Sequence, residues 1–364
     1  MAFAQHCLVL PILPGAPKQQ ALQQLRHVRR AVRRGITMQP QAASSYGAYR
    51  PARPKPWVQG QDAYQPDDAW KADMEMAATE KVRSGGFKAS GKTVVVTGGS
   101  QGIGRATALL FARKGYNVVV AARQPERLQY VADDCKAAAG RNGASLAVPC
   151  DITKEADVKA LVNRVLAKFD SVDIVINNAG VCLQGTFEET SMEDYRNMLD
   201  INFLGAVAVT QGFLPVLQKT AKRRGAFEKP AVVMVNSYGG KIPIRAMPAY
   251  TASKYALAGF TDAIRPELES YGIHLAQVHP GMVRSNFLER AEFRGMDADD
   301  KRTAMTQLLQ TAPFVQKPEE VAQAIYDAAI SRRNEVTVGM PFQAAMAGFK
   351  TLGINPFSLG VLAS

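Results

Sequence analysis

The chain has 364 residues, 47% of them hydrophobic, which is enough for one large α/β domain with extensions. Of its net charge of +12, residues 1–61 supply +9 through nine Lys or Arg and no acidic residue, which leaves +3 for residues 62–364. The folded part therefore has little electrostatic support for binding nucleic acid, which we exclude as a partner.

The acid-free, arginine-rich start of the chain is typical of an organelle transit peptide, and we assign residues 1–61 to it. Arginines spaced through Ala21–Arg34 fit a mitochondrial presequence, whereas the Ala-, Ser-, Tyr- and Pro-rich stretch Gln39–Pro56 fits a chloroplast peptide of the algal kind. We expect the chloroplast, with the mitochondrion as the alternative. A disordered basic tail on a cytosolic enzyme also fits this composition.

Residues 62–91 are polar and mixed in charge, and we interpret them as a linker. No apolar run reaches the length that spans a bilayer, so we expect no transmembrane segment. The cysteines show no close pairing, and neither they nor the four histidines have metal-ligand spacing; the cysteines are Cys7, Cys135, Cys150 and Cys182. We therefore expect free thiols and no metal.

From residue 92 to 339, short apolar runs alternate with helical stretches. The expected strands are Thr93–Thr97, Asn117–Ala122, Ser145–Pro149, Ile174–Asn177, Ala231–Ser237, His274–His279 and Glu335–Val338. This alternation predicts an α/β fold, a Rossmann-like doubly wound parallel sheet of about seven strands with helices on both faces. A ligand crevice is expected at the carboxyl ends of the strands.

A glycine-rich turn joins the first strand to the first helix, with the sequence Thr97-Gly98-Gly99-Ser100-Gln101-Gly102-Ile103-Gly104. Such a junction suits a dinucleotide: Gly98 permits the tight turn, Gly102 lets the backbone approach a pyrophosphate, and Gly104 allows close helix packing. Free N–H groups at the helix start would face the anion. The plain alternative is a flexible loop.

The spacing Thr-Gly-x-x-x-Gly-Ile-Gly resembles the cofactor turn of the short-chain dehydrogenases/reductases. The other motifs of that family follow in its order: Asn177-Asn178-Ala179-Gly180, Asn202, Ser237, Tyr250-Thr251-Ala252-Ser253-Lys254 and Pro280-Gly281-Met282-Val283. The resemblance covers residues 92–339, and it implies a nicotinamide-dependent oxidoreductase. It also implies a catalytic tetrad of Asn202, Ser237, Tyr250 and Lys254.

Carbonyl reduction needs a hydride donor, a proton donor for the developing alkoxide, and groups that place the carbonyl. Tyr250 and Lys254 are four residues apart and share one helix face. The lysine ammonium and a positively charged nicotinamide ring would lower the tyrosine pKa and favour the phenolate. Ser237 can hydrogen-bond the substrate oxygen, and in the family the residue matching Asn202 holds a water in a proton relay from the lysine.

The second strand ends in Ala121-Ala122-Arg123, where NAD and NADP are distinguished. Ala122 stands where NAD-preferring family members usually place Asp, and Arg123 can attract a 2′-phosphate, so we expect NADP(H). Gln101 replaces a basic residue common in the family, which makes the preference less absolute. Alternatively, Arg123 is a solvated residue at a helix start.

The resemblance extends to further cofactor contacts along the strand ends. Asp151 resembles the family's adenine-binding Asp, although Asp is also a favoured helix N-cap. The Pro280–Ser285 loop matches the family's carboxamide-binding loop, with Ser285 in place of Thr. The resemblance also implies that Tyr250 and Lys254 contact the cofactor, since in the family the matching lysine holds the nicotinamide ribose. The remaining cofactor-binding residues implied in this way are Ser100, Gln101, Ile103, Ile152, Asn178, Ala179, Gly180, Gly281 and Val283.

The segment after Ser285 covers the substrate in the family, and here it is apolar. Its apolar residues are Phe287, Leu288, Phe293 and Met296, followed by a helical stripe of Met305, Leu308, Leu309 and Ala312. We therefore expect a hydrophobic carbonyl or alcohol substrate, of acyl or isoprenoid type. Packing against the domain is the alternative explanation of this stripe.

Two other apolar segments point to partners. Met198–Leu217 is apolar on nearly all sides and matches a family interface helix, so we expect a homodimer or homotetramer, although burial in one subunit gives the same pattern. The extension 340–364 is expected to form an oligomer contact or a peripheral membrane anchor. Its apolar residues are Phe342, Met346, Phe349, Leu352, Phe357, Leu359 and Leu362. The basic stretch 219–229 is expected to be a solvated loop.

Together these observations favour an NADP(H)-dependent oxidoreductase that interconverts a ketone or aldehyde and an alcohol. The first alternative is a 3-oxoacyl-carrier-protein reductase of fatty-acid synthesis. The apolar extension 340–364 departs from the usual carboxyl-terminal end of such reductases. The second is a non-catalytic NADP(H)-sensing interaction protein, which would have no need of all four tetrad residues.

Overall fold

A computed structural model describes residues 91–140, 143–225, 228–285, 290–339, 342–344 and 347–348. The expected transit peptide, nearly all of the linker and most of the extension 340–364 lie outside the described residues, as do Phe287 and Leu288. The described residues contain the main sheet and the helices that cover it.

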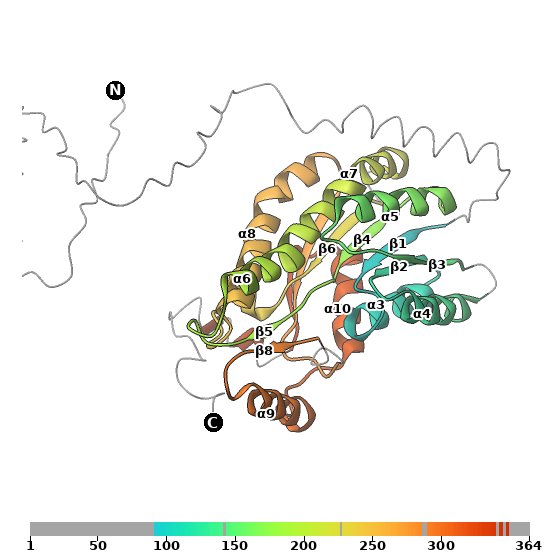
Figure 1. The fold of residues 1–364 in the computed structure, drawn as a ribbon. Coiled ribbons are helices and arrows are strands. Elements are labelled where there is room, and N and C mark those ends of the chain that lie inside the picture. The colour runs from blue at the N-terminus through green and yellow to red at the C-terminus, as the bar shows by residue number, and fades with distance from the viewer. Residues whose placement is uncertain are drawn as a thin grey trace, which may run out of the picture. The chain divides into compact units, whose positions relative to one another are not determined.

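Seven parallel strands form one sheet in the order β3-β2-β1-β4-β6-β7-β9 (Figure 1). Their bounds are β1 (Thr93–Thr97), β2 (Asn117–Ala122), β3 (Ser145–Pro149), β4 (Ile174–Asn177), β6 (Ala231–Val235), β7 (His274–His279) and β9 (Glu335–Thr337). The order reverses between β1 and β4, which is the switch point where doubly wound sheets bind their ligands. The predicted Rossmann-like fold is confirmed.

Helices cover both faces of the sheet and make two hydrophobic cores. α3 (Gly102–Arg113), α4 (Pro125–Ala138) and α10 (Pro318–Ser331) lie over one face; α5 (Glu155–Lys168), α7 (Gly205–Arg224) and α8 (Pro248–Ser270) lie over the other. On β1, Val94 and Val96 enter the first core while Val95 enters the second. Burial from both sides explains why the strands are continuous apolar runs.

Some expected elements differ at their ends. The strand expected at Ala231–Ser237 ends at Val235, because the backbone N–H of Ser237 donates to the side-chain Oδ1 of the preceding residue, Asn236, at 2.9 Å. Ser237 instead caps a short 3₁₀ turn, Tyr238–Gly240. The last strand ends at Thr337 rather than Val338.

A small second sheet pairs β5 (Leu183–Gln184) with β8 (Glu292–Phe293). With α6 (Met192–Leu199) and α9 (Ala298–Thr311), it lies beyond the carboxyl ends of the main strands (Figure 1). We call β5, β8, α9 and the turns beside them the cap. Strands of two residues carry no periodicity, so the sequence could not predict them.

The segment Met198–Leu217 is not one uniform helix. α6 passes through a π-helical stretch, η2 (Asp200–Leu204), into α7. The whole stretch Met192–Arg224 is long and apolar enough to cross a bilayer by length and composition, so the expectation that no run reaches this length is wrong. Phe213 and Leu217 are nevertheless fully buried in the core shared with α5, as in a core helix of the α/β layer.

The basic stretch 219–229 is helical as far as Arg224, contrary to the expected loop. Arg224 ends α7 with an ion pair to the buried carboxylate of Asp173 at 2.8 Å. Basic side chains are favourable at a helix carboxyl end, which explains why the helix continues here.

Candidate active site

A pocket opens at the carboxyl ends of the sheet strands beneath the cap. Of the residues expected to bind the cofactor, its lining includes Gln101, Gly102, Ile103, Gly104, Asn178, Gly180, Tyr250, Lys254, Pro280, Gly281, Val283 and Ser285. Gly98, Ser100 and Ala179 belong to the same turns without lining it, and Arg123, Asp151 and Ile152 lie where β2 and β3 end. Among the described residues, no group of three or more His, Cys, Asp or Glu side chains is arranged to hold a metal ion.

The glycine turn makes an anion site at the start of α3. Gly98 has φ +63°, and a Cβ on Gly104 would lie 2.2 Å from the Gly98 carbonyl oxygen, so helix and turn touch closely. Gln101, at the N-cap position, makes no side-chain cap, and the first turn of α3 has no acidic residue. The free backbone N–H groups at the start of α3 therefore face the pocket with no acidic side chain in that first turn. This arrangement fits the pyrophosphate of a dinucleotide.

The turn after β4 is tied to the glycine turn through Thr97, a residue that the sequence analysis did not single out. Thr97 Oγ1 accepts from the backbone N–H groups of Asn178 at 3.0 Å and Ala179 at 3.2 Å. The Asn178 amide donates back to the Thr97 carbonyl at 2.9 Å. These bonds therefore fix the two turns that flank the switch point, and Asn178 joins them.

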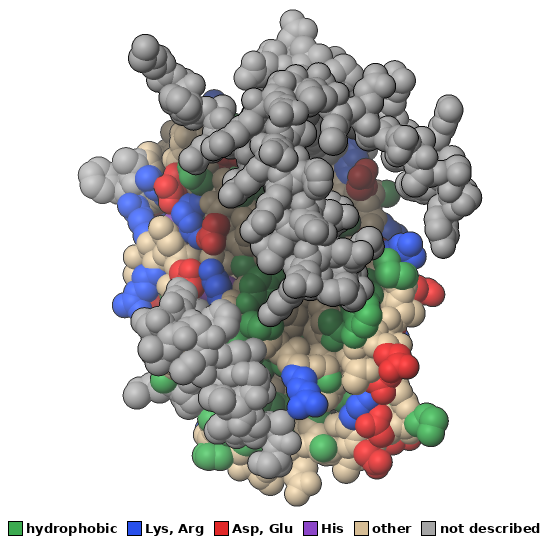
Figure 2. All heavy atoms as spheres, turned by 90° about the vertical axis from the view of Figure 1, so that its left-hand side faces the viewer, with side chains coloured by type: hydrophobic (Ala, Val, Ile, Leu, Met, Phe, Trp, Pro, Cys, Tyr) green, Lys and Arg blue, Asp and Glu red, His purple; other side chains and the backbone are tan. Residues whose placement is uncertain are grey.

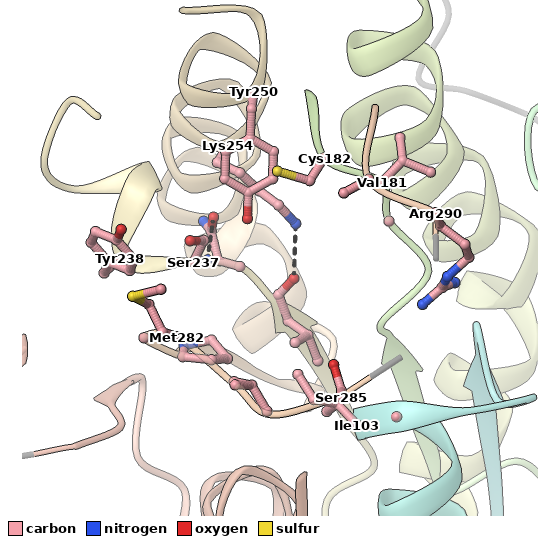
Figure 3. Close-up of a pocket in the computed structure, with 18 of the residues that line it drawn as sticks. Ile103, Val181, Cys182, Ser237, Tyr238, Tyr250, Lys254, Met282, Ser285 and Arg290 are labelled. Carbon is pink, nitrogen blue, oxygen red and sulfur yellow. Dashed lines mark hydrogen bonds between the residues drawn. The ribbon is translucent and has the colours of Figure 1, made fainter. Parts of the chain in front are cut away.

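Ser237 from the turn after β6 and Tyr250 and Lys254 from α8 come together, as the tetrad predicts (Figure 3). All three are buried, and the Tyr250 hydroxyl hydrogen-bonds Ser237. Lys254 Nζ donates to the Val235 carbonyl at 3.3 Å and lies 5.9 Å from the centroid of the Tyr250 ring. Serine, phenol and ammonium groups therefore converge in a pocket whose lining also contains many apolar side chains.

Burial dominates the protonation of these groups. Desolvation raises the pKa of Tyr250 well above its ordinary value, although the bond to Ser237 opposes this shift. Desolvation also lowers the pKa of Lys254 to about 8. Lys254 is not among the groups that shift the Tyr250 pKa in the protein by itself, where desolvation is the largest cause. The lowering expected from the ammonium together with a bound nicotinamide ring stays a prediction.

Asn202 lies outside the pocket lining, one layer behind it. Its Oδ1 accepts from the Val181 N–H at 2.8 Å, and its Nδ2 donates to the Val181 carbonyl and to Ser253 Oγ, both at 3.0 Å. Both amide protons are thus used within the protein, which leaves an Oδ1 lone pair for a water. The π-helical stretch η2 sets Asn202 at this position, and such stretches are frequent at functional sites.

The Pro280–Ser285 loop is held by Gln316, which no sequence signal identified. Gln316 Oε1 accepts from Gly281 N–H at 3.1 Å, its N–H donates to the Met282 carbonyl at 2.8 Å, and its carbonyl accepts from Arg284 N–H at 2.8 Å. A buried glutamine side chain and its backbone therefore fix three parts of the loop.

Phe342 packs against the same loop. A Cβ on Gly281 would lie 2.1 Å from the Phe342 ring, and this ring lies 5.0 Å from that of Tyr238. The ring is only 4% exposed, so the expectation that Phe342 belongs to an oligomer contact or membrane anchor is wrong. Gly281 is required here because the ring occupies the place of a side chain.

Arg123 and Asp151 are close at the neighbouring strand ends. The pKa of Asp151 is lowered from its ordinary value. Partial burial alone would raise this pKa, but the hydrogen bonds from Thr153 and the positive charge of Arg123 have the larger combined effect. Asp151 does not cap α5, whose N-cap is Lys154, so the capping interpretation is wrong. Ile152 is buried and packs against Gly205 at the start of α7.

A second cation, Arg127, was missed by the sequence analysis. From the first turn of α4 it donates to Gln101 Oε1 at 2.7 Å. Arg127 follows Arg123 by four residues, a spacing that was a usable signal. Arg127 therefore brings a second positive charge to the glycine turn.

The cap supplies the apolar wall of the pocket. Phe293, Met305 and Leu309 line it as expected, whereas Met296 is fully exposed and does not. Cys182, Ile244, Met247, Met282 and Arg290 also line the pocket and were not predicted to do so. Figure 2 shows hydrophobic side chains in the middle of the described part of the face that forms the left-hand side of Figure 1. A basic side chain lies just below them, and other basic and acidic side chains lie nearer the margins.

Comparison with known proteins decides the family. The short chain dehydrogenase family matches residues 92–294, more than half of the chain. This chain belongs to that family. "Dehydrogenase/reductase SDR family member 7B" of Xenopus laevis is 32% identical over 265 residues, which are 71% of this chain and 77% of that protein.

Solved structures of short-chain dehydrogenases agree with this. A short-chain dehydrogenase from Streptomyces avermitilis has a TM-score of 0.61 at 28% identity, covering 72% of this chain and 92% of that one. A 3-ketoacyl-(acyl-carrier-protein) reductase from Brucella melitensis, complexed with NADH, has a TM-score of 0.59 at 25% identity, covering 69% and 97%. The protein is therefore an oxidoreductase of CH–OH groups that uses a nicotinamide dinucleotide, NAD or NADP.

Proposed function

We propose that the protein is an NADP(H)-dependent enzyme that interconverts a hydrophobic ketone or aldehyde and its alcohol. The observation that carries this proposal is the convergence of Ser237, Tyr250 and Lys254 on an apolar pocket that adjoins the uncapped start of α3. The uncapped helix start, the Asn178–Gly180 turn and the Pro280–Ser285 loop fit the pyrophosphate, the ribose and the carboxamide of the cofactor. When bound there, the cofactor supplies the hydride.

The side chains have distinct tasks in carbonyl reduction. Ser237 and Tyr250 hold the substrate oxygen by hydrogen bonds, and the Tyr250 hydroxyl gives its proton to the alkoxide as it forms. A tyrosine is protonated at neutral pH even at its ordinary pKa, and burial raises the Tyr250 pKa further. The protonated phenol is the form that reduction requires. The Lys254 ammonium then stabilises the phenolate left behind, and Asn202 fixes the backbone at Val181 beside them.

The preference for NADP(H) rests on two arginines and a missing acid. Arg123 follows β2, Ala122 offers no carboxylate to a ribose 2′-hydroxyl, and Arg127 reaches the glycine turn through Gln101. A 2′-phosphate at this place would meet two guanidinium groups. Asp151, which lies near Arg123, reduces this positive charge without removing it.

Cofactor titrations test this preference. A charge-assisted hydrogen bond contributes about 1.5–3 kcal/mol, so Arg123→Ala should weaken NADPH binding roughly ten- to hundredfold and leave NADH nearly unchanged. Adding Ala122→Asp should weaken NADPH further and improve NADH. Dissociation constants from fluorescence titration at fixed salt measure both effects. Equal losses for the two cofactors would remove Arg123 as the basis of the preference.

The substrate class is tested by turnover. Purified protein is screened against ketones, aldehydes and alcohols of increasing chain length, with NADPH absorbance as the readout. We expect the highest kcat/KM for long apolar carbonyls, because Ile244, Phe293, Met305 and Leu309 line the pocket. A strict requirement for an acyl-carrier substrate would instead identify a 3-oxoacyl-carrier-protein reductase. Cofactor binding with no turnover of any compound would favour the non-catalytic alternative.

A further inference from the structure

His279 is a fully buried histidine that the mechanism does not use. It ends β7, directly before the Pro280–Ser285 loop. Successive residues of a strand point to opposite faces, and Val278 enters the core beneath α10. His279 therefore points to the face covered by α8, the helix that carries Tyr250. Burying an imidazole is costly unless its nitrogens form hydrogen bonds, so the partners of this ring show what it is for.

The ring bonds the backbone of Ser237. Its Nδ1 lies 2.9 Å from the Ser237 carbonyl oxygen, and because a carbonyl oxygen only accepts, Nδ1 carries the proton and donates. The other nitrogen, Nε2, has no hydrogen-bond partner among the described residues. It lies 3.9 Å from a carboxylate oxygen of Glu335, whose other oxygen pairs with Lys241 at 3.2 Å. The Ser237 carbonyl is thus the hydrogen-bond partner that accounts for burying this ring.

Ser237 lies at a gap in the pairing between the β6 end and β7. The residues on both sides of it donate their N–H groups to carbonyls in or directly after β7, Asn236 at 2.8 Å and Tyr238 at 3.0 Å. The Ser237 backbone has no such bond within the described residues: its N–H bonds the Asn236 side chain, and its carbonyl accepts from Gly240 inside the 3₁₀ turn at 3.0 Å. The His279 ring supplies the link to β7 that the Ser237 backbone lacks.

We propose that His279 is a positioning residue that holds Ser237, so that the Ser237 hydroxyl keeps the direction in which it binds the substrate oxygen. This inference rests on the proposed function, because it adds a residue to the same site. Ser237 Oγ accepts from the Gly239 N–H at 3.0 Å, which leaves the hydroxyl proton for the substrate. His279 itself does not line the pocket and acts through Ser237.

The bond between His279 and Ser237 does not depend on the charge of the ring. Desolvation lowers the pKa of His279 to about 4 and outweighs the bond to the Ser237 carbonyl, which raises it. The charged groups that face the ring are Glu335 on β9, Lys241 after the 3₁₀ turn and Asp262 on α8. Nδ1 carries a proton in both the neutral and the protonated ring, so the positioning role should be the same across the pH range of an assay.

Three substitutions separate the donor from the ring. The amide nitrogen of asparagine is as many bonds from Cα as Nδ1, whereas that of glutamine corresponds to Nε2. We therefore expect His279→Leu and His279→Gln to lower kcat/KM for ketones roughly ten- to hundredfold, and His279→Asn to keep most of it. NADPH dissociation constants should stay close to the wild-type value. A loss of NADPH affinity equal to the loss of turnover would show that His279 supports the cofactor loop instead, and the proposal would be overturned.

His274→Leu is the matched control. His274 is buried on the same strand, and its Nε2 bonds the Ala328 carbonyl on α10 at 3.2 Å. The substitution also removes one buried bond between a histidine and a carbonyl, but away from the pocket. It should lower the thermal unfolding temperature comparably and leave kcat/KM unchanged. Equal losses of turnover in His274→Leu and His279→Leu would mean general destabilisation and would refute the positioning role.

A double variant tests whether His279 acts through Ser237. In a Ser237→Ala background, His279→Leu should lower kcat/KM little further, because the hydroxyl that it positions is already gone. If the two losses multiply as independent effects, the proposal is wrong.

A binding measurement separates this inference from the proposed function. Octanamide offers its carbonyl oxygen to the same hydrogen bonds but is not reduced, and calorimetry follows its binding to the protein–NADPH complex. Ser237→Ala and His279→Leu should weaken it alike, roughly two- to tenfold, and His279→Asn should weaken it little. This pattern without turnover of any ketone or aldehyde would keep the positioning role and refute the function. Wild-type turnover that His279→Leu leaves intact would refute the positioning role alone.

Discussion

Burial of the tyrosine and the lysine determines in which direction the pKa of each group shifts. Tyr250 and Lys254 are 8% and 5% exposed, and desolvation shifts each toward its neutral form. A neutral phenol is a proton donor, which is the role that carbonyl reduction gives to Tyr250. Sequence spacing placed these two groups on one helix face, but it could not predict how strongly each is desolvated.

Tyr250→Phe is expected to abolish turnover while cofactor affinity stays close to that of the wild type. The change removes the proton donor but little volume, and the ring remains packed between α8 and the cap. Steady-state rates on the identified substrate and NADPH titration check the two parts separately. Retention of most activity would exclude Tyr250 from the proton transfer.

The pH dependence of cofactor binding should follow Lys254. Its folded pKa is about 8 against an ordinary 10.5, so the ammonium is present below about pH 8 and is lost as pH rises through this value. If Lys254 holds the nicotinamide ribose, as in the family, NADPH affinity should fall with an inflection near pH 8. Lys254→Arg keeps its charge at all these pH values and should lack the inflection.

The same pKa shift gives a stability effect of known sign. Because the unfolded chain holds the lysine proton more tightly, the buried ammonium destabilises the cofactor-free protein below pH 8, and this penalty declines as pH rises from 8 toward 10.5. In Lys254→Met the free energy of unfolding should lack this contribution. Urea unfolding at several pH values measures the difference, and parallel curves for the two proteins would show that the pKa of Lys254 does not change on folding.

At the scale of elements, local sequence signals predicted the sheet and the glycine turn. The support of the Pro280–Ser285 loop and the cap depend instead on contacts between residues far apart in sequence, which local signals do not show. The strands β1 to β4 and β7 match their expected bounds because fully buried β-branched runs are unambiguous. Gln316 and Phe342 lie 35 and 61 residues from Gly281 in sequence, and only the fold brings them to it. Arg290 and the two-residue strands of the cap likewise have no local signature.

Phe342 and Gly281 provide a test of how the carboxyl-terminal part of the chain supports the cofactor loop. In Gly281→Ala the new methyl group would lie 2.1 Å from the Phe342 ring, so the loop must shift and NADPH affinity should fall at least roughly tenfold. Phe342→Ala removes the obstructing ring, at a stability cost of about 3 kcal/mol for a buried phenylalanine.

The double variant distinguishes a specific contact from general destabilisation. With Phe342 already removed, Gly281→Ala should cost NADPH binding much less than it does alone, because the methyl group then has space. Thermal unfolding of all three variants reports stability independently of cofactor affinity. Strictly additive losses in the dissociation constant would refute the coupling between the loop and Phe342.

At the scale of the whole molecule, the chain divides into two regions of different charge. Residues 1–61 carry +9 without any acid, whereas the domain that follows has mixed charge. We therefore predict that a fluorescent fusion of residues 1–85 enters the chloroplast. Mitochondrial fluorescence would correct the organelle, and a uniform cytosolic signal would refute targeting.

Self-association is a second property of the whole molecule, and the surface of η2 and α7 is the part of the structure from which we predict it. One side of η2 and α7 is apolar and only partly covered: Leu204 is 49% exposed, and Ala208 and Leu214 are partly buried on the outer side of the core. Phe203 of the same stretch meets Phe260 of α8 at 5.7 Å, which extends this surface to a second helix. Partly exposed apolar residues at helical spacing on adjacent helices are typical of an interface between subunits.

We therefore predict that the protein is a homodimer or homotetramer through this surface. Leu204→Glu would place a charge in the interface and leave the fold intact, since half of the side chain is already solvent-exposed. Light scattering after size-exclusion chromatography should show an oligomer for the wild type and a smaller species for Leu204→Glu. Tyr130→Glu is the matched control, because Tyr130 is 72% exposed on α4, on the opposite face of the sheet. A monomeric wild type, or an equal effect of both substitutions, would show that this surface does not join subunits.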